Sequence, residues 1–107
     1  MSVGPAIVRV WRYRVEAQHR VVFEQRYGSD GDWVRLFRQA GGFTGTQLWR
    51  DPLDPAIYLT LDHWRSASDF HGFLTRFGSQ YAALDRICDA LTSEEIDLGQ
   101  YEDTGPG

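Results

Sequence analysis

The chain contains very little sulfur, with one cysteine, Cys88, and one methionine among 107 residues. A single cysteine excludes an internal disulfide framework and is typical of a reducing compartment. Long apolar runs are also missing. The apolar stretch at residues 6–10 is interrupted at Arg9, which argues against a secretory signal peptide, and no run approaches the ~20 apolar residues of a membrane span. We therefore expect a cytoplasmic protein with no membrane contact.

An excess of positive charge is absent as well. There are 11 basic and 15 acidic side chains, which give a formal net charge of −4, and the isoelectric point is about 5.2. Nucleic-acid and anionic-membrane surfaces need a basic patch that outweighs the acids, so we expect neither partner. Metal-ligand spacing, a phosphate loop and a nucleophile elbow are missing too. We expect no metal, no nucleotide and no bound cofactor.

The chain does contain enough apolar material for one compact core. Hydrophobic residues make up 42% of the sequence and aromatic residues 14%. At this length the composition predicts a single domain over residues 1–107, with an ordered core at about residues 6–102.

The stretch around which we interpret the chain is YLTLDHW at Tyr58–Trp64, followed by RSASDF. It alternates as a strand does, and the Ser66-x-x-Asp69 pattern after it can cap the first amides of a long helix. One side of the strand carries Ile57, Leu59 and Leu61, and the other carries Tyr58, Thr60, Asp62 and Trp64. Because both sides carry apolar bulk, we expect this strand to be central in its sheet.

The same patterns assign the rest of the chain. Strands are predicted over residues 7–15 and 43–50, with a weaker one over 95–102. Helices are predicted over residues 17–27, from Ser29 through a Ser29-x-x-Asp32 cap, and from Ser66 onward with a break near Gly78 and Ser79. Residues 1–5 and the tail from Asp103 are expected to be flexible. This order is that of an α+β, ferredoxin-like βαββαβ fold with an antiparallel sheet.

That fold places its helices on one face of the sheet and leaves the other face bare. The strands over residues 7–15 and 57–64 nevertheless carry apolar side chains on both sides, and a large exposed apolar sheet face is rare in monomers. We therefore expect a homodimer that pairs its sheet faces.

The strand-to-helix stretch LTLDHWRSASDF, the preceding Gly42-Phe43 and the aromatic helix that runs to Tyr81 and Leu84 carry a resemblance. The sequence resembles the antibiotic biosynthesis monooxygenase family over roughly residues 7–101, and the block at 27–37 looks like one branch of it. The resemblance implies a dimeric α+β barrel. It also implies oxygen activation without metal or flavin, in which a deprotonated phenolic substrate donates an electron to oxygen.

Family members that form quinones are similar in carrying a tryptophan at the end of this strand, an asparagine four residues before it and a tyrosine six residues after it. Here Trp64 matches, while Thr60 and Phe70 occupy the other two positions. Thr60 can donate one hydrogen bond, but Phe70 cannot exchange a proton. Haem-degrading members carry a tryptophan where this chain has Phe73, together with a histidine on the same helix, so we do not expect a haem.

We predict a pocket between helices and sheet for a small hydrophobic, aromatic or polyketide-like molecule. Its candidate residues are Trp64, Thr60, Asp62, Arg12, Phe70, Phe73 and Phe77. Each has a structural alternative, because the aromatic residues suit a core equally well. Asp62 is either a base whose pKa is raised by desolvation or a partnered carboxylate. Arg12 either fixes a phenolate or forms an ion pair with Asp62 or Glu95.

The histidines are further candidate bases, because imidazole titrates near neutral pH. His63 is expected on the sheet face opposite Trp64, His71 beside the apolar stripe of its helix, and His19 in solvent. A structural role is the simpler interpretation for each, so no catalytic residue is assigned. Two functions stay open, namely a cofactor-independent monooxygenase-like enzyme and a non-catalytic ligand-binding module of the same fold.

Overall fold

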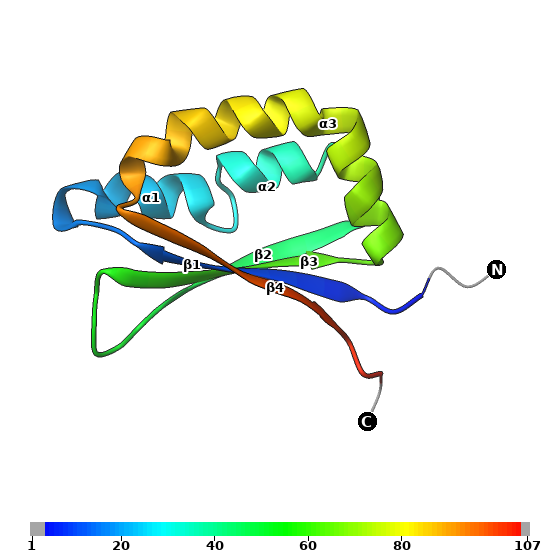
Figure 1. Ribbon diagram of the computed structural model, residues 1–107, viewed down its shortest axis with the longest axis horizontal. Coiled ribbons are helices and arrows are strands. Elements are labelled where there is room, and N and C mark those ends of the chain that lie inside the picture. Colours follow the sequence, from blue (N-terminus) through cyan, green and yellow to red (C-terminus); the bar gives the residue numbers. More distant parts are fainter. Residues whose placement is uncertain (1–3, 106–107) are drawn as a thin grey trace.

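The structure is a computed structural model that describes residues 4–105. Within this range four strands form one antiparallel sheet in the order β2-β3-β1-β4. They are β1 (Ile7–Arg14), β2 (Phe43–Arg50), β3 (Ile57–Trp64) and β4 (Glu94–Glu102). The helices α1 (Arg20–Tyr27), α2 (Asp32–Phe37) and α3 (Ala67–Cys88) all lie on one face of the sheet (Figure 1). The predicted α+β, ferredoxin-like fold is confirmed.

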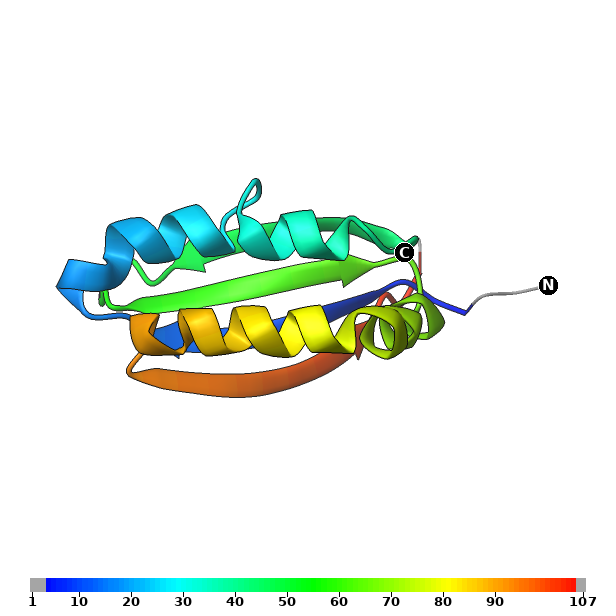
Figure 2. The same ribbon diagram turned by 90° about the horizontal axis from the view of Figure 1, so that it is seen from above.

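The helices form two rows above the sheet. Helices α1 and α2 follow one another over the side of β2 and β3, and α3 runs beside them over the side of β1 and β4 (Figure 2). Single 3-10 turns, Ala17–His19 and Asp89–Leu91, lead into α1 and out of α3. Side chains from both rows and from the covered sheet face fill the space between them. The largest fully buried ones include Trp64, Tyr58, Phe23 and Phe73.

Strand β3 is central, as predicted, because it pairs with both β1 and β2. In the β1–β3 register, Arg9 lies opposite Asp62 and Trp11 lies opposite Thr60. Facing residues on neighbouring strands point to the same side of a sheet. The side that carries Trp64 is therefore the helix-covered side, and it also carries Arg9, Trp11 and Tyr13.

Helix α3 begins and bends where the sequence indicates. The Ser66 hydroxyl accepts a hydrogen bond from the Asp69 amide at 3.1 Å, which confirms the predicted cap. Phe77 leaves the helical conformation, with φ −119° and ψ 19°, one residue before the predicted break. The helix therefore consists of two segments, and the first of them packs against Trp64.

The predicted cap at Ser29 is wrong. Helix α2 begins at Asp32 after Gly31, without a side-chain cap, because residues 28–31 form a tight turn closed by a 3.0 Å hydrogen bond from the Gly31 amide to the Gly28 carbonyl. A Cβ atom at position 31 would collide with the Arg26 carbonyl, so only glycine fits this turn.

Both ends of the described chain lie at one end of the sheet. The Asp103 amide donates a hydrogen bond to the Ala6 carbonyl at 2.8 Å, which continues the β1–β4 pairing beyond the strands. The prediction of flexible ends falls partly on residues 1–3 and 106–107, which lie outside the described residues.

Candidate functional site

A small cavity lies between the covered face of the sheet and the helices. It is lined by Trp11, Tyr13, Tyr27, Trp33, Phe37, Thr60, Asp62, Tyr81, Asp85 and Glu95. Its empty space, including the mouth toward solvent, is about 360 Å³, but the part wide enough for a water molecule is only about 20 Å³. In the described conformation the cavity therefore holds about one water molecule.

Asp62 is a half-buried acid in the wall of this cavity. Its Oδ1 atom accepts a hydrogen bond from the Thr46 hydroxyl on β2 at 2.7 Å. Burial raises the pKa of the Asp62 carboxyl to about 6, although the Thr46 hydrogen bond and the charge of Arg9 both lower it. A carboxyl group with such a pKa can accept a proton and release it again near neutral pH.

Two buried donors that line the cavity have no hydrogen-bond partner of good geometry among the described residues. They are the Thr60 hydroxyl, on a side chain that is 3% exposed, and the Trp33 indole N–H, on a side chain that is 8% exposed. The Tyr13 hydroxyl lies near Thr60, and Tyr27 and Cys88 lie near Trp33, but none of them completes a well-aligned hydrogen bond. A buried polar group without a partner costs roughly 1–3 kcal/mol. A ligand with an acceptor oxygen in this cavity would recover that energy.

The remaining polar groups make the cavity acidic. Burial raises the pKa of Tyr13 well above its usual value, and burial together with the charge of Asp85 raises the pKa of Tyr81 to about 12. Burial and the nearby Asp85 and Asp89 also raise the pKa of Glu95. Three carboxyl groups and no arginine or histidine line the cavity.

Thr60 and Asp62 are the two predicted site residues that the structure brings to this cavity. Trp64 lies deeper in the core, 1% exposed, with its ring centroid 5.2 Å from that of Phe43 and 5.5 Å from that of Phe37. The predicted Phe70, Phe73 and Phe77 surround it or follow it along α3, and none of them lines the cavity. The cavity therefore lies nearer the start of β3 than the sequence indicated.

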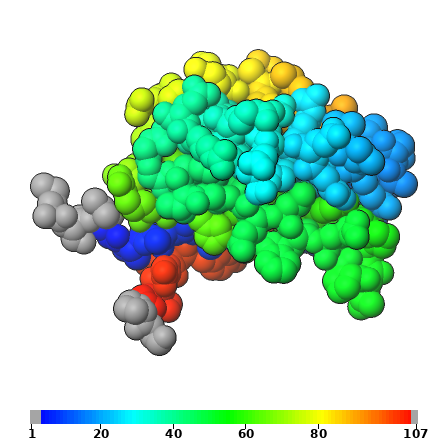
Figure 3. Space-filling model, turned by 180° about the vertical axis from the view of Figure 1, so that it is seen from behind, coloured from blue at the N-terminus to red at the C-terminus, as the bar shows by residue number. Residues whose placement is uncertain are grey.

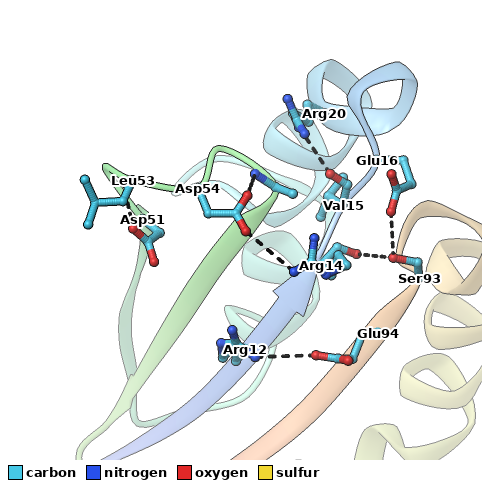
Figure 4. Close-up of polar contacts among 11 residues, drawn as sticks. Arg12, Arg14, Val15, Glu16, Arg20, Asp51, Leu53, Asp54, Ser93 and Glu94 are labelled. Carbon is cyan, nitrogen blue, oxygen red and sulfur yellow. Dashed lines mark hydrogen bonds and ion pairs between the residues drawn. The ribbon is translucent and has the colours of Figure 1, made fainter.

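The prediction that Arg12 reaches the helix-covered cavity is wrong. Arg12 lies on the opposite sheet face, where its guanidinium pairs with Glu94 at 3.4 Å, and Arg14 on the same face pairs with Asp54 at 3.5 Å (Figure 4). Strand alternation places Arg12 one position out of phase with Trp11 and Tyr13, which do face the helices. Arg12 does form an ion pair, as the alternative predicted, but its partner is Glu94 rather than Asp62 or Glu95.

The histidines and Cys88 stay outside the cavity lining. His63 lies on the bare sheet face, as predicted, with its Nε2 atom 3.0 Å from the Gln47 Oε1 atom. His71 is exposed on α3, and Cys88 is buried in the core. Within residues 4–105, no cluster of histidine, cysteine and acidic side chains could hold a metal ion, and no helix is long and apolar enough to cross a membrane.

Sequence reasoning missed most of the cavity wall. Trp33 and Tyr27 come from the first helical row, whose apolar stripe gave no reason to prefer a pocket over a core. Tyr81 and Asp85 are four residues apart on α3, so they share a helix face. That spacing was the one feature of the sequence that could have placed Asp85 at the cavity. Glu95 reaches the cavity because it pairs with Tyr13 across β1 and β4.

The arrangement as a whole is a ferredoxin-like sheet with a small, acidic, aromatic-walled cavity beneath its helices. Solved structures with the same architecture cover nearly the whole chain. A Bordetella bronchiseptica protein assigned to the antibiotic biosynthesis monooxygenases matches 94% of this chain and 99% of its own, with a TM-score of 0.75 and 16% identity. A Deinococcus radiodurans protein with the same assignment gives a TM-score of 0.71 at 18% identity, covering 94% of this chain and 95% of its own.

SnoaB, a cofactor-independent oxygenase from Streptomyces nogalater, matches 97% of this chain and 100% of its own, with a TM-score of 0.65 and 20% identity. No protein-family model matches the sequence, and no curated protein matches it. At these identities the likeness establishes the fold. The chain has the fold of the antibiotic biosynthesis monooxygenases, as its sequence resemblance indicated.

Proposed function

We propose that the protein is a monooxygenase-like enzyme that oxidises a small aromatic or polyketide-like phenol in this cavity, without a metal or flavin of its own. The observation that carries the proposal is Asp62, a half-buried carboxyl group with a raised pKa of about 6, in a cavity that also contains two donors without a well-aligned hydrogen-bond partner among the described residues. The likeness to SnoaB, a cofactor-independent oxygenase, supports the same class of reaction. The free, buried Cys88 is in keeping with a cytoplasmic setting.

In this proposal Asp62 accepts the phenol proton, and the Thr60 hydroxyl and Trp33 indole N–H donate hydrogen bonds to the resulting phenolate. The phenolate passes one electron to molecular oxygen, and the two radicals combine to form a carbon–oxygen bond on the ring. The peroxide takes back the proton held by Asp62. Loss of water, which also removes the ring hydrogen, leaves a quinone, so one phenol and one oxygen molecule give one quinone and one water.

The test is oxygen uptake with a panel of phenols and hydroquinones. We expect at least one compound for which oxygen is consumed and the oxidised product appears in a one-to-one ratio, as the balance above requires. Protein unfolded by heat is the control for spontaneous oxidation. A panel in which several phenols bind in the cavity and none is oxidised faster than in the control would contradict the enzymatic proposal.

A phenol ring is larger than one water molecule, so the cavity must open to admit it. The wall most suited to move is the second segment of α3, because Tyr81 and Asp85 lie on it and the break at Phe77 separates it from the segment packed on Trp64. Gly78 follows the break directly, and a Cβ atom there would meet nothing within 4 Å.

Gly78→Ala should therefore stabilise the fold by about 0.5–1 kcal/mol, because alanine restricts the unfolded chain and favours helix. It should also slow ligand entry by stiffening the break, which stopped-flow binding would measure. Gly72→Ala is the matched control, because position 72 is equally open but lies in the first segment. Equal entry rates in both variants would argue against α3 as the moving wall.

A second candidate function is a non-catalytic binding module for a small hydrophobic ligand. Thr60 and Phe70 favour it, since they stand where quinone-forming family members carry asparagine and tyrosine. Such a module would bind phenols in the same cavity and leave oxygen untouched.

We also propose that two copies pair through the bare sheet faces. This face carries Leu59 and Leu61, and Trp49 on it is 56% exposed. The β2–β3 hairpin, with Leu53 93% exposed, and the end of β4 extend beyond the sheet on the side away from the helices (Figure 3). A second copy seated between these projections would remove the apolar side chains from water.

Sedimentation should accordingly give twice the 12.3 kDa mass of the chain. Trp49→Glu places a charge on the face and should shift the protein toward monomer at micromolar concentration. Val21→Glu is the control, because Val21 is 70% exposed on the helix side. A wild-type protein that sediments as a stable monomer would overturn the dimer.

A further inference from the structure

The charge of the cavity points to a narrower class of ligand than an aromatic compound in general. Three carboxyl groups line the cavity, Asp62 from β3, Asp85 from α3 and Glu95 from β4, and no basic side chain lines it. Arg9 lies outside the lining, 6.0 Å from the Trp11 ring centroid, and its charge lowers the pKa of Asp62, but its guanidinium is already paired with Asp97 at 3.0 Å. The side chain expected to neutralise a ligand anion, Arg12, lies on the other sheet face. The cavity therefore opposes negative charge.

The aromatic walls favour positive charge independently of the acids. Six aromatic rings line the space, two of them the indoles of Trp11 and Trp33. A cation over an aromatic face is attracted to the ring quadrupole, and the attraction is strongest for tryptophan and in desolvated sites. Rings that enclose a cavity together with carboxylates form an environment suited to an ammonium group.

The acids alone would not define a site, since acidic side chains near a surface usually serve solvation. The unpartnered Thr60 hydroxyl and Trp33 indole N–H are what point to a ligand, because both are more than nine-tenths buried and line the same space. They call for an acceptor atom, such as a phenolic oxygen, in the same molecule that brings the cation.

We propose that the cavity binds an aromatic compound carrying a protonated amine, with its ammonium group toward Asp85 and Glu95 and its oxygen toward Thr60 and Trp33. The binding of this compound is inferred independently of the proposed function. Only its oxidation rests on that function. The assignment also answers a difficulty of that function. An acid-lined cavity disfavours a phenolate, and an ammonium group on the same substrate supplies the missing positive charge.

The experiment compares three probes that share one phenol ring and differ in the charge of their side group, namely the 4-hydroxy derivatives of benzylammonium, benzyl alcohol and benzoate, which are named below by their parent compounds. Binding is followed through the indole N–H resonances of ¹⁵N-labelled protein. Trp11 and Trp33 line the cavity, whereas the exposed Trp49 on the bare sheet face is an internal control within the same spectrum. We expect benzylammonium to bind about tenfold or more tightly than benzyl alcohol near neutral pH. Its binding should shift the Trp11 and Trp33 signals and leave Trp49 unchanged, and benzoate should bind most weakly.

The double variant Asp85→Asn, Glu95→Gln should remove most of the preference for benzylammonium. Glu94→Gln should leave it unchanged, because Glu94 neighbours Glu95 but pairs with Arg12 on the other sheet face. Benzoate binding as tightly as benzylammonium, shifts confined to Trp49, or a preference that survives the double variant would each overturn the inference.

The inference and the proposed function can fail separately. Oxidation of neutral phenols without any binding of benzylammonium would overturn the inference and leave the enzyme proposal intact. Benzylammonium binding in the cavity, with no oxygen uptake for any aminophenol, would support the inference and count against the enzyme.

Discussion

Replacing Asp62 with asparagine will reduce oxygen-dependent turnover of a phenol by about 10²–10⁴-fold, the usual contribution of a positioned general base. Asparagine has nearly the same shape and can still contact the Thr46 hydroxyl, so binding should change much less than the rate. Wild-type activity should rise with pH through about 6, where the Asp62 carboxyl loses its proton, and the variant should lack this step. The measurement is the initial rate of oxygen consumption across that pH range.

The same substitution should stabilise the fold at alkaline pH. Burial raises the pKa of Asp62 from 3.8 to about 6, so the folded state binds this proton more tightly than the unfolded state does. Stability therefore falls as pH rises between these two values, and the loss persists above pH 6. By linkage the cost is at most about 3 kcal/mol, since each pKa unit corresponds to about 1.36 kcal/mol.

Asparagine does not ionise, so Asp62→Asn should unfold at a higher temperature than wild type near pH 8 and at a similar temperature near pH 4, below the raised pKa. Asp30→Asn is the control, because the same chemical change at a side chain 92% exposed should alter neither stability nor rate. A variant that is less stable than wild type at both pH values, or that keeps full turnover, would exclude the catalytic assignment.

The sequence predicted the fold well because the fold depends on periodic patterns that are local. Each of the correctly predicted features depends on only a few neighbouring residues. Examples are the alternation of β3, the cap at Ser66 and the glycine after the break in α3. The misplaced start of α2 had a different cause. The tight turn at Gly31 depends on contact with the Arg26 carbonyl, which a capping pattern does not reveal.

The cavity was predicted less well because it depends on how distant segments are brought together. Thr60 and Asp62 were found, since they share a strand face with Trp64. Glu95 and Trp33 reach the same space only through the β1–β4 register and the packing of α2. Arg12 was misplaced for a related reason. Both faces of β1 carry large side chains, so alternation alone did not say which face the helices cover.

Trp64→Ala should be among the most destabilising substitutions in the chain. The side chain is 1% exposed and contacts the rings of Phe37, Phe43, Phe70 and Phe73, with centroids 5.2–5.5 Å apart. Removing a buried indole leaves a cavity that costs about 3–5 kcal/mol. For a domain of this size that loss lowers the melting temperature by more than about 10 °C, which thermal unfolding will measure.

Trp64→Phe should be far milder. It keeps a ring in the cluster, and it removes an indole N–H that has no hydrogen-bond partner among the described residues. Losing an unsatisfied buried donor offsets part of the lost packing, so we expect a cost below about 1.5 kcal/mol.

The matched variant Trp33→Phe separates packing from ligand binding. Trp33 and Trp64 are both buried, and both indole N–H groups lack a partner in the described part of the chain, but only Trp33 lines the cavity. The same chemical change at position 33 removes a donor to the ligand oxygen, so binding or turnover should fall about tenfold, the size of one hydrogen bond to a charged acceptor. At position 64 both should stay at the wild-type level. If Trp64→Phe loses ligand binding and Trp33→Phe does not, the functional pocket lies at the Trp64 end of the sheet, and the cavity described above is packing space.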